Sequence, residues 1–418
     1  YPLRRQRQMC IRDRNSNAFN YISSKYKFRF NVVTSFYEFK KRGKKASWEK
    51  YDDRYKNQIL LELMKEHIDV PSEKVNIFIE SIEVSPHYNP FEKYFKELKP
   101  WDKKKDYIKK IARTIETENP KRFKDTLQRF LVGCIDCLLN PDSVNDVCLV
   151  FQSGQGIGKT RWMRSLLPRQ FQSEYLYEGN IDTRNKDHTM YLSQYWFIHL
   201  DELETLKSNE IGAIKSFITR QRISVRKSYG RYTSHLVRRS SFLGSVNEDK
   251  FLSDITGNRR WLVFKVSDID YMHGIDPDNM WAQAYHLYKK GYRHWFDIEE
   301  IKLINKHNEE FRTISLEEEL LLRYFEFNKE GGEGEELSSS EIIEKIIANI
   351  PQFSNKMRTI SMGKALSKHC LYKRMTKGIQ RYFVNYLGVE HETQSPSPAG
   401  NADSLSLIHI SEPTRRTP

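Results

Sequence analysis

The chain contains 418 residues, enough for two or three domains, and it carries a formal net charge of +14. Its hydrophobic content of 38% and aromatic content of 13% predict a folded, soluble protein. No apolar run reaches the roughly 20 residues that a membrane span requires, and no signal peptide is visible. Five irregularly spaced cysteines form no disulfide framework, so we expect a cytoplasmic protein with no membrane partner.

The two ends of the sequence look foreign to the protein. Residues 8–14 can be encoded by a DNA sequence whose core, taken as its reverse complement, encodes residues 405–410. This relation is expected when a sequencing-transposon adapter is read at both ends of a DNA fragment. We therefore expect residues 1–14 and 404–418 to be adapter artefacts and the natural N-terminus to be missing; two chance basic tails are the alternative. These tails contribute +4 and +1 to the total of +14, so the body carries +9 and remains compatible with a polyanionic partner.

Residues 15–140 are expected to form an α+β N-terminal region that is mostly helical. Aromatic and aliphatic residues within 26–39 predict a short hairpin of half-buried strands. Residues 52–68 and 103–139 have helical patterns, and the second pattern is interrupted near Pro120.

Residues 141–268 alternate continuous apolar runs with helical patterns. Such runs are typical of strands that are buried on both faces of a sheet. They occupy residues 146–152, 195–200, 241–246 and 261–266. Helical patterns at 159–167 and 208–219 separate them, so we predict an α/β nucleotide-binding core.

The C-terminal third returns to helical patterns. Residues 269–328 are expected to form a helical extension, and the Gly/Glu-rich stretch that follows is expected to be a linker. Residues 337–390 combine two or three short helices with a strand-like ending, an order that favours a small winged-helix-like domain. Residues 391–418 are expected to form a disordered tail.

The strongest motif lies between a predicted strand and a predicted helix and has the composition of a phosphate-binding loop, or P-loop. Its glycines let backbone N–H groups curl round a β-phosphate at the positive end of the helix dipole. We expect Lys159 to contact the β- and γ-phosphates of ATP and Thr160 to bind Mg²⁺. A serine stands where a first glycine is usual, and a chance glycine turn is the alternative. The predicted nucleotide-binding residues are Ser153, Gly154, Gln155, Gly156, Ile157, Gly158, Lys159 and Thr160.

A second motif, of the Walker B type, is an apolar strand that ends in Asp201 and Glu202. We expect Asp201 to hold Mg²⁺ and Glu202 to polarise the attacking water; solvated acids at a strand edge are the alternative. Glu204 is expected to be exposed, with support of Glu202 as the alternative. Asn247 follows another predicted strand, where its amide can orient the water against the γ-phosphate or can serve only as a turn residue.

Two arginines precede the last apolar run of the core. Arg259 or Arg260, with Arg259 preferred, is expected to reach the γ-phosphate of a neighbouring subunit as an arginine finger. Pairing with acids inside one subunit is the alternative.

Residues 220–239 form the most basic window, with seven Arg or Lys residues, no acids and interleaved tyrosines. Alternation before a glycine turn predicts a basic hairpin that grips phosphates and stacks bases, with a solvated charge run as the alternative. The DNA contacts predicted here are Arg226, Lys227, Tyr229 and Arg231.

Cys134 and Cys137 form a CxxC pair within a helical pattern. No second pair and no spaced histidine accompanies them, so two buried thiols are favoured over a zinc site.

Taken in order, these motifs resemble the virulence-associated protein E-like proteins of prophages and mobile elements, which are related to superfamily 3 helicases. The matching segments are 154–160, 200–202, 215, 225–230 and 256–260, with 89–91 and 101–102 upstream, and the resemblance spans residues 18–390. It implies an AAA+-like core, a role in replication of mobile DNA and assembly into a homo-oligomeric ring. It also implies that Lys215 lies before the basic hairpin as a DNA contact.

The leading hypothesis is therefore an ATP-hydrolysing, helicase-like motor that acts on single-stranded or forked DNA. A nucleotide-switched DNA-binding regulator is one alternative, and a primase-associated DNA-binding module without unwinding activity is another. DNA-stimulated turnover distinguishes the motor from the switch, because only a motor must couple strand binding to hydrolysis.

Overall fold

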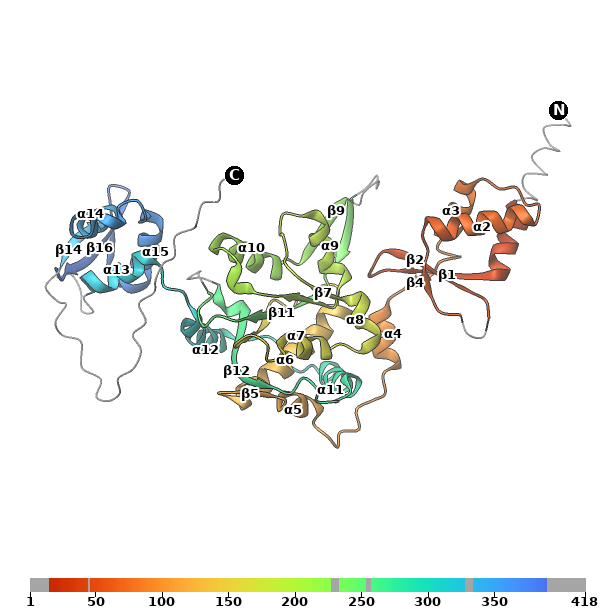
Figure 1. Ribbon diagram of the computed structural model, residues 1–418, viewed down its shortest axis with the longest axis horizontal. Helices are drawn as coiled ribbons and strands as arrows, with labels where there is room; N and C mark the ends of the chain where they lie inside the picture. Colours follow the sequence, from red (N-terminus) through yellow and green to blue (C-terminus); the bar gives the residue numbers. More distant parts are fainter. Residues whose placement is uncertain (1–14, 44–45, 227–232, 253–256, 328–333, 389–418) are drawn as a thin grey trace, which may run out of the picture. The chain divides into compact units, whose positions relative to one another are not determined.

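The computed structural model shows a mixed α/β fold in two compact units, which meet in sequence between Thr313 and Ile314 (Figure 1). The structure describes residues 15–43, 46–226, 233–252, 257–327 and 334–388. Both predicted adapter tails lie outside this described part of the chain. The boundaries proposed for smaller domains from the sequence stay predictions.

The first unit begins with a helix at residues 15–25, followed by a sheet of strand order β3-β2-β1-β4. Its strands are β1 (Tyr26–Asn31), β2 (Phe36–Lys41), β3 (Glu49–Lys50) and β4 (His87–Tyr88). Tyr26 and Phe28 alternate onto one face and pack against α2 (Asp53–Lys65) and α3 (Ser72–Glu80). The predicted hairpin is therefore present, as the antiparallel pair β1 and β2.

The central sheet of the same unit has six strands in the order β5-β12-β6-β11-β8-β7. These are β5 (Ile115–Thr117), β6 (Cys148–Gln152), β7 (Leu176–Glu178), β8 (Phe197–Leu200), β11 (Ser241–Val246) and β12 (Trp261–Ile269). All neighbours pair in parallel except β5, which is antiparallel to β12. Leu149 and Phe151 of β6 enter one core, whereas Cys148 and Val150 enter another. Burial on both faces explains why these strands are continuously apolar.

Helices cover both faces of the central sheet. One core receives residues of α4 (Pro90–Glu97), α5 (Tyr107–Ala112), α6 (Pro120–Leu139), α7 (Lys159–Ser165), α8 (Arg169–Tyr175), α11 (Pro277–Lys289) and α12 (Ile298–Asn308). The other core receives residues of α9 (Lys186–Gln194) and α10 (Ser208–Ile218). Asn119 caps α6 by accepting a hydrogen bond from the Arg122 amide, and Pro120 occupies its first turn. This cap explains the interruption that the sequence shows near Pro120.

The short elements of the first unit connect these layers. They are η1 (Leu203–Thr205), η2 (Asn258–Arg260), η3 (Glu309–Phe311) and the antiparallel pair β9 (Arg222–Arg226) and β10 (Thr233–Val237). The paired strands β9 and β10 correspond to the predicted basic hairpin, although its tip at 227–232 lies outside the described residues.

The second unit has its own core. Its elements are α13 (Leu316–Tyr324), β13 (Phe325–Glu326), β14 (Glu335–Ser338), α14 (Ser339–Asn349), η4 (Pro351–Phe353), α15 (Thr359–His369), β15 (Lys373–Thr376) and β16 (Ile379–Tyr386). Strand β16 pairs antiparallel with β13, β14 and β15. The winged-helix assignment for this unit stays a prediction.

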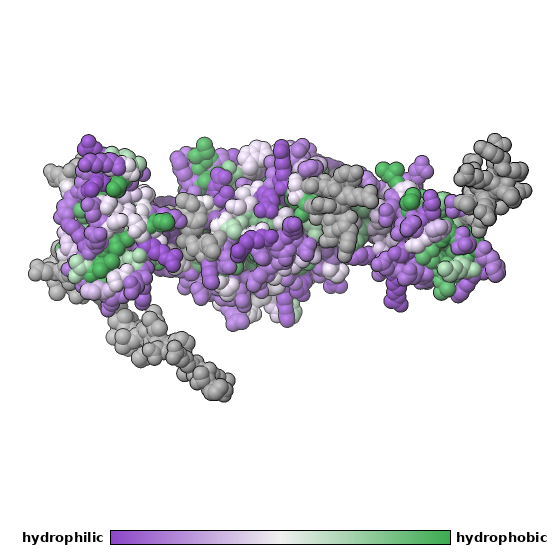
Figure 2. All heavy atoms as spheres, turned by 90° about the horizontal axis from the view of Figure 1, so that it is seen from above, coloured by the Kyte–Doolittle hydropathy of each residue, from purple (hydrophilic) through white to green (hydrophobic). Residues whose placement is uncertain are grey.

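The space-filling view shows a mostly hydrophilic surface, on which apolar residues form small separate patches (Figure 2). Of the helices that the structure describes, none has the length and apolar character needed to cross a membrane.

Candidate nucleotide-binding site

The loop between β6 and α7 lies at the carboxyl edge of the central sheet. Gly156 and Gly158 have φ angles of +88° and +100°, a backbone region that glycine adopts at low cost. A Cβ atom at Gly158 would also lie only 2.3 Å from Cδ1 of Tyr271. The loop geometry therefore requires glycine at this position, both for its φ angle and for the approach of the tyrosine ring.

Lys159 opens α7 and turns its ammonium group back towards this loop. Nζ donates to the carbonyl oxygens of Ser153 and Gly154 at 2.9 and 3.0 Å, and to the side chains of Ser153 and Asn247 at 2.9 Å each. Burial lowers the pKa of Lys159, whereas the carboxylates of Glu204 and Asp201 act to raise the pKa. The ammonium group of Lys159 is thus held as a donor to oxygen atoms at the mouth of the loop.

Asp201 and Glu202 directly follow β8, which is a neighbour of β11 in the sheet. Ser245 on β11 donates a hydrogen bond to a carboxylate oxygen of Asp201, so the acid is oriented by the adjacent strand. Glu202 is exposed and has a φ angle of +51°, a left-handed conformation that is uncommon outside glycine. The turn directs the chain away from the sheet immediately after the two acids.

Glu204 makes a connection that the sequence reasoning missed. One carboxylate oxygen, Oε1, accepts from the backbone N–H of Asn247 at 3.0 Å and from its Nδ2 at 2.9 Å. The amide oxygen of Asn247 then accepts from Lys159, so the three residues form a chain of hydrogen bonds. The expected exposure of Glu204 is wrong, because its side chain is half-buried against Asn247. The apolar Leu203 between the acids was the available signal in the sequence, and the structure buries this side chain.

A cavity of about 380 Å³ joins these groups. Its lining residues are Gln155, Gly156, Ile157, Gly158, Lys159, Thr160, Arg161, Asp201, Glu202, Asn247 and Tyr271. Most of the predicted nucleotide, metal and catalytic residues therefore surround one space. Tyr271 is an addition that no sequence motif indicated; its ring centroid lies 5.2 Å from Cζ of Arg161.

Arg259 and Arg260 do not line this cavity. Arg259 is exposed on η2, whereas Arg260 is half-buried and donates to the carbonyl oxygen of Gly257 at 3.4 Å. Burial and the neighbouring Arg259 lower the pKa of Arg260. The exposed side chain belongs to the arginine that the sequence favoured as a finger, and its role stays a prediction.

Lys215 lies in the interior of the first unit. Its side chain is only 4% exposed and donates to Oδ1 of Asn258 at 2.9 Å. Asn308 in turn donates to the carbonyl oxygen of Asn258 at 2.7 Å. A lysine buried in this way cannot contact DNA without a rearrangement, so this placement does not support the DNA contact implied by the family resemblance.

Fewer side chains of the basic window can contact DNA than its composition indicates. Arg238 is fully buried and donates to the carbonyl oxygens of Ile218 and Arg220 at 3.1 Å each, at the end of α10. Arg239 is 8% exposed and donates to the carbonyl oxygen of Leu138 at the end of α6. Two of the seven basic residues therefore cap helices. The DNA contacts predicted in this window stay predictions. Arg226 ends β9, and Lys227, Tyr229 and Arg231 lie outside the described residues.

Cys134 and Cys137 are both fully buried within α6. Burial raises the pKa of each thiol, which keeps both in the neutral form. The prediction of two buried thiols is confirmed.

The fold and the site together define a class: a mixed α/β protein in which a glycine loop, two acids and an amide meet at the carboxyl edge of a parallel sheet. The virulence-associated protein E-like domain matches residues 95–313, more than half of the chain. The chain belongs to the virulence-associated protein E-like family.

Two solved structures illustrate the structural similarity. The apo structure of the NrS-1 C-terminal region is 12% identical, with a TM-score of 0.46, and the match covers 87% of this chain and 97% of that one. The structure described as SCCmec type IV Cch, active helicase, is 10% identical, with a TM-score of 0.37 and coverage of 86% and 92%. No protein with a curated annotation matches the chain.

Proposed function

We propose that this chain is an ATP-hydrolysing motor that acts on DNA, a helicase-like replication protein of a prophage or mobile element with an AAA+/superfamily 3 P-loop core. One observation carries the proposal: Lys159, Thr160, Asp201, Glu202 and Asn247, from three segments of the chain, line a single cavity. This set contains the cation, the metal ligands, the base and the amide that phosphoryl transfer to water requires.

The residues present fit Mg²⁺ and a nucleoside triphosphate. The hydroxyl of Thr160 and the carboxylate of Asp201 are oxygen ligands, the type that Mg²⁺ prefers, and both line the cavity. Mg²⁺ bound there would supply positive charge that neutralises the phosphate oxygens. Lys159 and the loop N–H groups would hold the β- and γ-phosphates, at the start of α7 where the helix dipole favours negative charge.

The chain's own groups then account for attack by water. Glu202 is exposed at the cavity and would accept a proton from the water. Asn247 would orient that water, and Glu204 would fix the direction of the Asn247 amide. Neither Arg259 nor Arg260 lines the cavity, so either residue would act as an arginine finger on the cavity of a neighbouring subunit in a ring.

Replacement of Lys159 by alanine tests this proposal. The variant should lose ATP hydrolysis and keep its circular dichroism spectrum, because the side chain contacts loop and amide oxygens rather than a hydrophobic core. Arg164→Ala is the matched control: this residue lies on the same helix, is outside the cavity and pairs with Glu178 at 2.6 Å. Wild-type turnover by a folded Lys159→Ala protein would refute the site.

A further inference from the structure

One face of the N-terminal sheet carries positive charge in an unusual register. Tyr26 and Phe28 of β1 are buried, so the alternate residues Lys27 and Arg29 point to the opposite face. Lys27 lies directly opposite Lys40 on β2. Like charges placed opposite each other destabilise a sheet, so this pair has no structural benefit to the fold.

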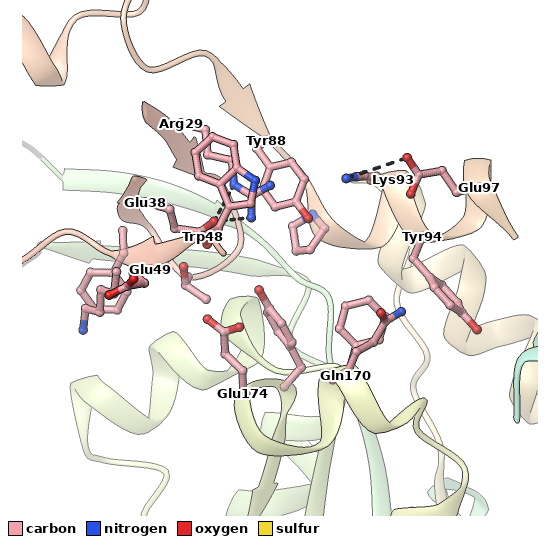
Figure 3. A pocket seen from close by; sticks show the side chains of 16 residues that line it. Arg29, Glu38, Trp48, Glu49, Tyr88, Lys93, Tyr94, Glu97, Gln170 and Glu174 are labelled. Carbon is pink, nitrogen blue, oxygen red and sulfur yellow. Dashed lines mark hydrogen bonds and ion pairs between the residues drawn. The ribbon is translucent and has the colours of Figure 1, made fainter. Parts of the chain in front are cut away.

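Aromatic rings accompany these cations. The guanidinium carbon of Arg29 lies 3.5 Å from the ring centroid of Tyr88 and 4.1 Å from that of Trp48, so the arginine is stacked between two rings (Figure 3). Glu38 accepts from Nε of Arg29 at 2.6 Å and orients the group further. The ammonium group of Lys40 lies 5.0 Å from the Trp48 ring centroid. Cations and aromatic rings thus alternate across the face.

A cavity of about 680 Å³ adjoins this face. Glu83 is its single carboxylate. Five basic residues line it: Lys27, Arg29, Lys40, Arg42 and Lys93. Among the described residues, no carboxylate forms an ion pair with Lys27, Lys40 or Arg42. These charges are available to an external polyanion.

A second cavity, of about 320 Å³, is also lined by Arg29 and has a mixed lining, in which four glutamates, Glu38 among them, stand beside Arg29, Lys50 and Lys93. Glu49, Glu97 and Glu174 line it, and Glu174 and Gln170 of α8 lie across it from the stacked arginine (Figure 3). Phosphates are disfavoured among these carboxylates. The first cavity, with five basic residues and one carboxylate, therefore offers a polyanion the more favourable electrostatic environment.

We propose that this basic face binds single-stranded nucleic acid, and we define it as Lys27, Arg29, Lys40, Arg42, Trp48 and Tyr88. Lysines without acidic partners suit backbone phosphates, and half-buried aromatic rings beside them suit unstacked bases, which a duplex does not offer. The face lies on the N-terminal sheet rather than on the β9–β10 hairpin, so it is a second contact for the DNA partner proposed above. It needs no ATP hydrolysis, and the two proposals can fail separately.

The test uses the full chain and a fluorescent oligothymidine of about 20 nucleotides, longer than the roughly 4–16 nucleotides that one nucleic-acid-binding fold covers. In the double variant Lys27→Gln/Lys40→Gln, the slope of log affinity against log salt should become shallower by about 1.4, which is about 0.7 for each lost phosphate contact. When salt rises from about 50 to 200 mM, both proteins lose affinity. The fold-loss of the variant should be about sevenfold smaller than that of the wild type.

A matched control separates the basic face from net charge. Lys41→Gln/Lys65→Gln removes the same charge from the same region, but Lys41 pairs with the buried Tyr26 on the other face and Lys65 is exposed on α2. This control should keep the wild-type salt slope. An equal effect of both double variants would overturn the proposal, and so would an unchanged slope for Lys27→Gln/Lys40→Gln.

Base stacking is tested through Trp48→Leu. Affinity for oligothymidine should fall about fivefold or more, whereas affinity for an abasic strand, which keeps the phosphates, should be unchanged. An equal loss on both strands would show that Trp48 only supports Arg29, and this result would overturn the stacking role. Equal losses by the lysine variant on duplex and single-stranded DNA would overturn the single-strand assignment. Basal ATPase should be the same in all variants, because none of the substituted residues lines the nucleotide cavity.

Discussion

Glu204 provides a sharp prediction because Asn247 is the only hydrogen-bond partner that the described residues offer it. Glu204→Ala removes the acceptor for both N–H groups of Asn247, while Lys159 continues to donate to the amide oxygen. The amide then loses the contact that fixes its direction towards the cavity. Glu204 does not line the cavity itself, so it acts as a positioning residue.

The magnitude follows from the type of hydrogen bond that is lost. A hydrogen bond to a charged group contributes about 1.5–3 kcal/mol. If one such bond stabilises the transition state, its loss should lower kcat for ATP roughly 10- to 150-fold, because each ~1.4 kcal/mol corresponds to a factor of ten. KM should change little, because the glycine loop between β6 and α7 is untouched. Glu204→Gln should retain most of the activity, because its amide oxygen can still accept from Asn247.

The pH profile supplies a second readout. Glu204 acts to raise the pKa of Lys159, so its removal should lower the pKa of this lysine further. The ammonium form would then be lost at a lower pH, and the alkaline limb of the kcat/KM profile should move towards neutral pH. Steady-state ATPase assays across pH measure both effects. Unchanged kcat and an unchanged alkaline limb in a folded Glu204→Ala protein would refute the hydrogen-bond chain.

Three further predictions concern other basic residues. Arg259→Ala should impair hydrolysis more than ATP binding, and mixing it with Lys159→Ala subunits should partly restore ATPase; absence of rescue in a verified oligomer would favour an intramolecular role. Arg226→Ala/Lys227→Ala should weaken binding to single-stranded DNA and flatten its salt slope by about one to two units, with basal ATPase retained; an unchanged slope would indicate a solvated hairpin. Arg238→Met should lower the free energy of unfolding by about 2–4 kcal/mol in a urea titration, because carbonyl groups at the end of α10 lose a buried donor. An unchanged free energy of unfolding would contradict this capping role.

Much of the central architecture was predictable because it depends on local patterns. Continuous apolar runs predicted β6, β8, β11 and β12, since strands buried on both faces leave no polar positions. Glycines followed by Lys159 located the turn into α7. Strand β5 was missed because three residues between two helices carry too little periodicity to be distinguished from a helix.

The predictions failed where the partner of a side chain lies far away in sequence. Arg238 reads as surface charge in a basic window, yet it caps a helix through carbonyl groups near residue 218. Lys215 likewise reads as an available cation, although Asn258 brings it into the interior. Tyr271 lines the cavity from a segment with no motif. Tertiary contacts of this type leave no local pattern in the sequence.

The central claim is that the cavity hydrolyses ATP, and ATP turnover by Glu202→Gln tests it most directly. Glutamine has the same shape and occupies the same left-handed backbone position, so the change removes only the base. Glu248→Gln is the control, because this exposed acid adjoins Asn247 but does not line the cavity. With single-stranded DNA present, Glu202→Gln should bind ATP as the wild type does. It should hydrolyse ATP at least about 100-fold more slowly, in line with the usual contribution of a general base. Wild-type turnover by Glu202→Gln, or absence of turnover in the wild type itself, would contradict the account.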